Sequence, residues 1–181
     1  QLLTGAAATA TVAGAAAAAY WVGGVNRVSH SLGKKVIVIG IDPCISNTGY
    51  GVVQRRGSQL LALDVGVIVT SPDTPLELRL SAIAGRVAGL IGEHKPAAMA
   101  IESIYFGKNA ESAFLVGQAR GAIVAQAGMA GVPVESYTPQ QIKLAVCGSG
   151  SAAKDQVQRM VGALLNLPSD PLPPDHAADA L

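Results

Sequence analysis

Hydrophobic and polar positions along the chain change their periodicity several times, and each change predicts a secondary-structure element. Residues 36–41 form an apolar, mostly β-branched run that ends at Asp42, which is typical of a strand buried on both faces. Residues 50–54 and 60–70 alternate or run apolar on either side of a turn at 55–58. This pattern predicts an antiparallel meander, so the first half of the chain is expected to supply three consecutive strands.

From Pro75 the periodicity becomes helical, because apolar residues recur at three- and four-residue spacing as far as Glu93. The elements predicted after it are a buried strand at 97–102, a helix at 109–130, a short strand at 132–136, helices at 139–146 and 151–165, and a Pro-rich linker at 168–174. We therefore predict an α/β fold whose mixed five-stranded sheet has an antiparallel three-strand edge and is flanked by helices.

The first 26 residues carry no charge and consist mostly of Ala, Gly and Thr. The stretch is long enough to span a bilayer, but these residues are weakly hydrophobic and no basic segment precedes them. We treat residues 1–35 as a disordered or artefactual tail and expect no membrane partner, with an anchor or signal as the alternative. Residues 36–181 are predicted to form one domain, which suits a chain of 181 residues.

Composition narrows the class of protein further. The chain is 50% hydrophobic and only 14% charged, which excludes a disordered chain. Its net charge of +1 means that any nucleic acid must bind a local patch. Cys44 and Cys147 lie far apart and outside any Cys-x-x-Cys spacing, so neither a disulfide framework nor a structural zinc site is indicated. A reducing cytoplasm is the expected location.

Two carboxylates each follow a buried strand. Asp42 ends the strand at 36–41, and Glu102 ends the strand at 97–102. The carboxyl ends of adjacent strands border the ligand crevice in α/β sheets, and a charge buried there stays ionised when a cation neutralises it. Either residue alone is more typical of a solvated strand end or a helix cap, whereas the pair favours a ligand site.

A third group of polar residues lies near the end of the chain. His176 and Asp179 are three residues apart and share one helical face. Together with Asp42 and Glu102 they make three carboxylates and an imidazole, a set suited to Mg²⁺ or Mn²⁺. The alternative is an ordinary helix start capped by Asp175.

Four groups of segments occur in a characteristic order and spacing. They are Gly40-Ile41-Asp42-Pro43 with residues 48–53, Ile101-Glu102 with residues 108–110 and 117–121, residues 148–154, and residues 175–181. On these segments, residues 36–181 resemble the RuvC family, the bacterial Holliday-junction resolvases of the RNase H-like superfamily. The resemblance implies an RNase H-like fold and an Mg-dependent crossover junction endodeoxyribonuclease that nicks opposing strands of four-way DNA symmetrically in recombination and repair.

The resemblance also implies the cofactor, the partners and the roles of individual residues. Two Mg²⁺ ions, for which Mn²⁺ substitutes, are implied in each active site. The implied metal-binding and catalytic residues are Asp42, Glu102, His176 and Asp179. The implied DNA-binding residues are Tyr105, which stacks on an unpaired base, its neighbour Phe106, and Lys108, Arg120, Lys143 and Lys154. The implied partners are four-way junction DNA, a second copy in a homodimer, and the RuvA-RuvB branch-migration complex.

Local signals refine two of these positions. Ser151 is a predicted N-cap, which places Lys154 in the first turn of a helix, where the helix N-terminus favours phosphate. Cys44 stands where the family has Gly in a turn of positive φ, so a strained backbone next to Asp42 is expected.

The last helix is expected to be truncated relative to the family, which leaves His176 and Asp179 weakly fixed. With the expected strain at Cys44, this leaves a catalytically weak or silent junction-binding protein as one alternative. A YqgF-type nuclease of the same fold is another. An actin-like ATPase or sugar kinase needs two such lobes, and 181 residues hold one.

Overall fold

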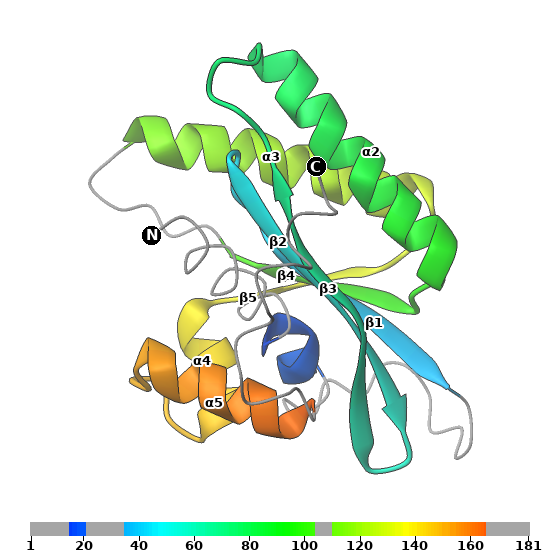
Figure 1. The fold of residues 1–181 in the computed structure, drawn as a ribbon, viewed down its shortest axis with the longest axis vertical. Helices are drawn as coiled ribbons and strands as arrows, with labels where there is room; N and C mark the ends of the chain where they lie inside the picture. Colours follow the sequence, from blue (N-terminus) through cyan, green and yellow to red (C-terminus); the bar gives the residue numbers. More distant parts are fainter. Residues whose placement is uncertain (1–14, 21–34, 104–109, 166–181) are drawn as a thin grey trace, which may run out of the picture.

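The computed structural model describes residues 15–20, 35–103 and 110–165 (Figure 1). In chain order the elements are β1 (Val36–Asp42), β2 (Asn47–Arg56), β3 (Gln59–Val69), α2 (Leu76–His94), β4 (Ala98–Glu102), α3 (Ala110–Met129), β5 (Val134–Tyr137), α4 (Pro139–Cys147) and α5 (Lys154–Leu164). Residues 15–20 form one further helical segment. The predicted elements from residue 36 to residue 165 are therefore all present, with boundaries shifted by a few residues.

The five strands form one mixed sheet in the order β3-β2-β1-β4-β5. The pairs β1–β2 and β2–β3 are antiparallel, whereas β1–β4 and β4–β5 are parallel. Gly57, whose φ is +62°, makes the tight turn between β2 and β3, a conformation that glycine adopts without steric cost. The predicted fold class, with its antiparallel three-strand edge, is confirmed.

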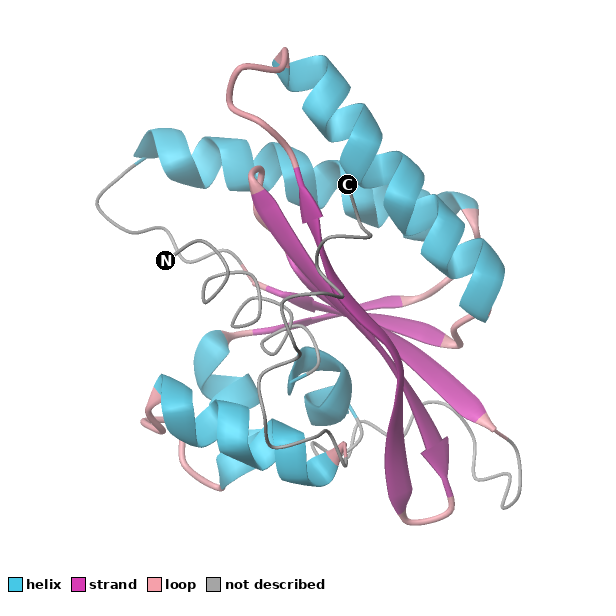
Figure 2. Cartoon of the chain, in the orientation of Figure 1, coloured by secondary structure: helices cyan, strands magenta, loops and turns pink. Residues whose placement is uncertain are grey.

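Helices α2 and α3 cover one face of the sheet, and α4 and α5 lie on the other (Figure 2). The alternation of side chains along each strand divides the core between these two faces. In β1, Ile39 and Ile41 pack toward α2 and α3, whereas Val38 packs toward α4 and α5. Position 42 therefore shares the face of Val38, the face that carries α4 and α5.

Residues 15–20 pack in the core on the face of α4 and α5. Ala15–Ala19 are fully buried and Tyr20 is 5% exposed, in one cluster with Val38, Ala98 and α5 residues such as Val161. The sequence prediction excluded this segment because it carries no charge and consists mostly of weakly hydrophobic residues. An alanine helix needs no polar face when it is enclosed on all sides, and alanine is the strongest helix former.

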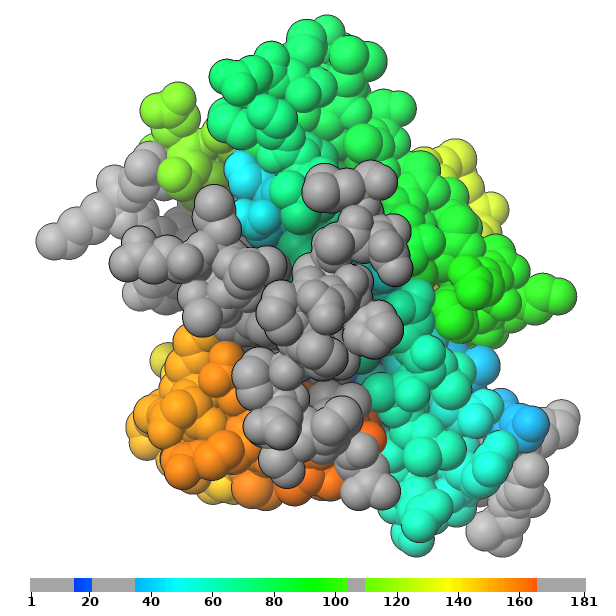
Figure 3. Space-filling model, in the orientation of Figure 1, coloured from blue at the N-terminus to red at the C-terminus, as the bar shows by residue number. Residues whose placement is uncertain are grey.

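On the side seen in Figure 3, α5 lies at the lower left and the β2–β3 hairpin at the lower right. Leu60 and Ala62 of β3 pack against the same cluster as α5, so the hairpin and this helix border one side of the core. None of the helices in the described ranges is both long enough and apolar enough to cross a bilayer.

Candidate active site

Asp42 and Glu102 lie side by side at the carboxyl ends of two parallel strands. Ile41 of β1 pairs with Ile101 of β4, and each carboxylate residue comes next on its strand. Neighbouring strands are about 4.8 Å apart, so the two side chains leave the sheet from adjacent positions on the same face. The adjacency predicted from the ends of the two apolar runs is therefore present in the structure.

Burial raises the pKa of both carboxyls, and the charge of Asp42 raises that of Glu102 further. Burial raises the pKa of Asp42 to about 6, while the positive charge of Lys154 acts in the opposite direction. Burial, and then the negative charge of Asp42, raise the pKa of Glu102 to about 7, while Lys143 lowers it. Two ionised carboxylates are thus poorly stabilised by the protein alone, and a divalent cation between them would favour their charged forms.

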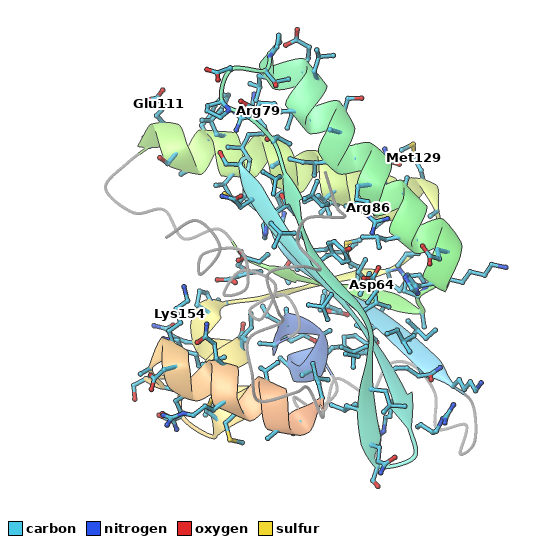
Figure 4. The ribbon with its side chains drawn as sticks, viewed as in Figure 1. Asp64, Arg79, Arg86, Glu111, Met129 and Lys154 are labelled. Carbon is cyan, nitrogen blue, oxygen red and sulfur yellow. The ribbon has the colours of Figure 1, made fainter. Side chains whose placement is uncertain are left out.

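The two lysines come from the helices that cover this face. Lys143 lies on α4, and Lys154 is the first residue of α5, where Figure 4 labels it. Their effects on the pKa of Glu102 and Asp42 place both ammonium groups within electrostatic range of the carboxylates. The structure therefore brings together four of the ten predicted site residues: Asp42, Glu102, Lys143 and Lys154.

The start of α4 is fixed directly after β5 by a capping box. The Thr138 hydroxyl accepts a hydrogen bond from the Gln141 backbone N–H at 3.2 Å, and the Gln141 side chain accepts one from the Thr138 N–H at 2.8 Å. The sequence Thr-Pro-Gln-Gln carries this signal, which sequence reasoning missed. The cap sets the direction of α4 and with it the position of Lys143. By contrast, the predicted cap of α5 is wrong, because its N-cap is Ala153 and not Ser151.

The loop after Asp42 differs from its prediction. Lys95 is the residue other than glycine that has a positive φ in the described ranges, so Cys44 does not adopt the conformation that would strain it. The Thr48 hydroxyl donates to the Cys44 carbonyl and accepts from the Cys44 N–H at 3.3 Å, which closes the turn. The expected distortion next to Asp42 is therefore wrong, because this turn uses backbone angles open to any L residue.

Arg120 lies on the other face of the sheet. Its guanidinium donates a 2.7 Å hydrogen bond to the Ser136 hydroxyl of β5, on the side covered by α3. This contact connects α3 to β5, the strand that pairs with β4, where Glu102 lies. Arg120 is half-buried, and its guanidinium has further N–H groups that could donate to a ligand.

Five predicted site residues, Tyr105, Phe106, Lys108, His176 and Asp179, lie outside the described residues. Within the described ranges, no cluster of three or more His, Cys, Asp and Glu side chains could hold a metal ion. Asp42 and Glu102 are thus the described part of the predicted ligand set. Both cysteines, Cys44 and Cys147, are described and free, as the sequence predicts.

Comparison with protein families and curated proteins gives a consistent result. A family model described as "Crossover junction endodeoxyribonuclease RuvC" matches residues 38–181. A protein of that name from Pelotomaculum thermopropionicum is 44% identical over 146 residues, which cover 81% of this chain and 88% of the relative. Another from Brevibacillus brevis is 46% identical over 144 residues, covering 80% of this chain and 86% of the relative.

Two solved structures resemble the fold over most of its length. One is described as "T. thermophilus RuvC in complex with Holliday junction substrate", with a TM-score of 0.72 and 41% identity over 80% of this chain and 88% of the other. The second, "Thermus thermophilus RuvC structure", has a TM-score of 0.69 and 40% identity over 80% of this chain and 89% of the other.

Proposed function

The chain belongs to the RuvC family of crossover junction endodeoxyribonucleases, and we propose that it resolves Holliday junctions by nicking opposing DNA strands. The observation that carries the proposal is the pair of adjacent buried carboxylates, Asp42 and Glu102, with Lys143 and Lys154 in electrostatic range. The fit of the described chain to a relative's structure with a Holliday junction substrate supports the same function.

The donor chemistry of the site fits divalent cations. Asp42 and Glu102 are hard oxygen ligands, and because burial is the main cause of their raised pKa values, a nearby cation would favour their charged forms. We assign them to a two-Mg²⁺ site, in which Mn²⁺ substitutes, together with His176 and Asp179 from the sequence. When bound, these ions supply Lewis-acid stabilisation of the scissile phosphate and make an attacking water more acidic.

The protein's own side chains bind and orient the DNA. Lys143 and Lys154 place positive charge beside the carboxylates, where it attracts a backbone phosphate to an otherwise acidic site. Lys154 is also in the first turn of α5, whose backbone N–H groups favour anions. The proposed contacts with the rest of the junction are Tyr105, Phe106, Lys108 and Arg120.

Symmetric cleavage requires two active sites, so we propose that the protein acts as a homodimer. We also propose that residues 36–181 form the nuclease domain, that RuvA-RuvB delivers the junction, and that the enzyme works in the cytoplasm. The relaxed turn at Cys44 removes one of the two reasons for expecting a catalytically silent protein.

The direct test of the proposed function uses a labelled four-way junction and a linear duplex of the same sequence. The chain is incubated with each substrate in Mg²⁺ and in EDTA. We expect paired symmetric nicks in the junction alone and in Mg²⁺ alone. Equal cleavage of both substrates, or cleavage in EDTA, would contradict the proposal.

A further inference from the structure

Arg79 is a buried cation in an unfavourable position. It lies in the first turn of α2 and is 8% exposed. A helix N-terminus repels positive charge, and burial removes the hydration of the guanidinium. Arg79 forms no ion pair with any carboxylate in the described ranges. Because this position is unfavourable for a positive charge, we expect Arg79 to have a role that an uncharged side chain could not fill.

The two side-chain hydrogen bonds of Arg79 lead to residues 45–46, one directly and one through Thr70. Its Nε–H donates to the Thr70 hydroxyl at 2.9 Å, and its Nη2–H donates to the Ser46 hydroxyl at 2.9 Å. The Thr70 hydroxyl in turn donates to the Ile45 carbonyl, and the Thr70 backbone N–H donates to the Ser46 carbonyl at 3.0 Å. Arg79 therefore connects α2, the end of β3 and residues 45–46 in a single network.

Residues 43–46 join Asp42 to β2, and both ends of this loop are held. The Thr48 hydroxyl fixes Cys44, and the Arg79–Thr70 network fixes Ile45 and Ser46. Ile45 is itself buried in the core cluster beneath α2. Because Asp42 is the residue before the loop, its backbone has little freedom to move while this network is intact.

We propose that Arg79 is a positioning residue that fixes the Asp42 carboxylate through its hydrogen bonds to the 45–46 loop and Thr70. The inference rests on the proposed function, since it assigns Arg79 to the support of a metal-binding carboxylate. The planar guanidinium donates in two fixed directions, which lysine cannot reproduce, so the role requires arginine and not merely positive charge.

The test compares Arg79→Lys with Arg86→Lys, a matched change on the same helix. Arg86 donates to the Tyr50 hydroxyl at 2.9 Å and pairs with Asp64 at 3.7 Å, and it lies farther along α2 than Arg79 (Figure 4). We expect Arg79→Lys to raise the Mg²⁺ concentration for half-maximal cleavage about tenfold, as loss of supporting contacts to metal ligands does. The single-turnover rate should fall by about tenfold to a hundredfold, with junction affinity unchanged. Arg86→Lys should alter none of these values.

Two further readouts make the result decisive. The Mg²⁺-induced rise in melting temperature should shrink in Arg79→Lys and persist in Arg86→Lys, and this readout requires no cleavage. Ser46→Ala, which removes one acceptor from the loop side, should shift the Mg²⁺ requirement in the same direction, so a failure of Arg79→Lys to fold leaves the proposal testable.

Normal Mg²⁺ dependence in both Arg79→Lys and Ser46→Ala would overturn the positioning role while leaving the proposed function intact. Equal loss in Arg79→Lys and Arg86→Lys would also overturn it, because a general loss of stability would then explain both. Absence of cleavage by the unmodified protein would contradict the proposed function instead, and the Mg²⁺-induced melting shift would still decide the role of Arg79.

Discussion

Asp42 and Glu102 are next to each other across two parallel strands, on the face of the sheet that also carries Lys143 and Lys154. Burial raises the pKa of both carboxyls, and the negative charge of Asp42 raises the pKa of Glu102 further. Such a pair is unfavourable for stability and suited to cation binding, which is a common compromise at functional sites.

The first prediction concerns stability in the absence of metal. A buried acid whose pKa is raised on folding stabilises the folded state only while it is protonated, so the free energy of unfolding should fall as pH rises from about 4.5 to about 7. Because glutamine stays neutral, Glu102→Gln should be more stable than the unmodified protein at pH 8 by about 2 kcal/mol. Urea denaturation in EDTA at pH 5 and pH 8 measures this, and the gain should shrink at pH 5. A less stable variant at pH 8 would show that the carboxylate is well compensated.

The second prediction concerns Lys154. If its ammonium neutralises a DNA phosphate, Lys154→Ala should weaken junction binding and reduce the slope of log affinity against log salt by about 1. Fluorescence anisotropy over a range of salt concentrations gives this slope. Lys35→Ala removes an exposed lysine at the start of β1 and serves as the control. The assignment fails if both variants show the same slope as the unmodified protein.

The third prediction concerns the alanine helix. A carboxylate at position 17 would be enclosed in the core, so Ala17→Glu should lower the free energy of unfolding by about 3 kcal/mol or more. Ala125→Glu, on an exposed position of α3, should change it by less than about 0.5 kcal/mol. Equal urea midpoints for the two variants would mean that residues 15–20 do not pack against the sheet in solution.

The fourth prediction concerns the turn after Asp42. Since the φ of Cys44 is not positive, a glycine there would relieve no backbone strain in the folded state. It would also give the unfolded chain more conformational freedom. Cys44→Gly should therefore be less stable than Cys44→Ala by about 0.5–1 kcal/mol. Thermal denaturation of the two variants compares them directly. A more stable Cys44→Gly variant would indicate that the cysteine backbone is strained after all.

Much of the fold could be predicted from the sequence because its first four strands are apolar or alternating runs next to clear turn residues. The apolar runs that end at Asp42 and Glu102 predict two buried strands. Because both carboxylates lie at the carboxyl ends of these strands, their adjacency could be inferred. The resemblance to the RuvC family is confirmed by the family model and by relatives above 40% identity. These features depend on local pattern and on the order of segments, and both can be read from the amino-acid sequence alone.

The features that sequence reasoning missed depend on contacts between distant segments. Arg79 occupies a helix N-terminus, where an arginine is normally interpreted as solvent-exposed, and its role depends on Ser46 and Thr70 in other elements. Residues 15–20 carry no amphipathic pattern because they are enclosed on all sides. The φ angle of Cys44 follows from hydrogen bonds to Thr48, which composition does not reveal.

The most direct test of the account separates binding from cleavage at the carboxylate pair. Asp42→Asn and Glu102→Gln remove one charge each at nearly constant shape, and Glu93→Gln makes the same chemical change on an exposed side chain of α2. Each protein is assayed with a labelled four-way junction for affinity in EDTA and for nicking in Mg²⁺. We predict that both site variants bind the junction normally and lose nicking by more than about a thousandfold, whereas Glu93→Gln binds and nicks the junction normally. Undiminished nicking by Asp42→Asn or Glu102→Gln would contradict the central claim that these two carboxylates form the active site.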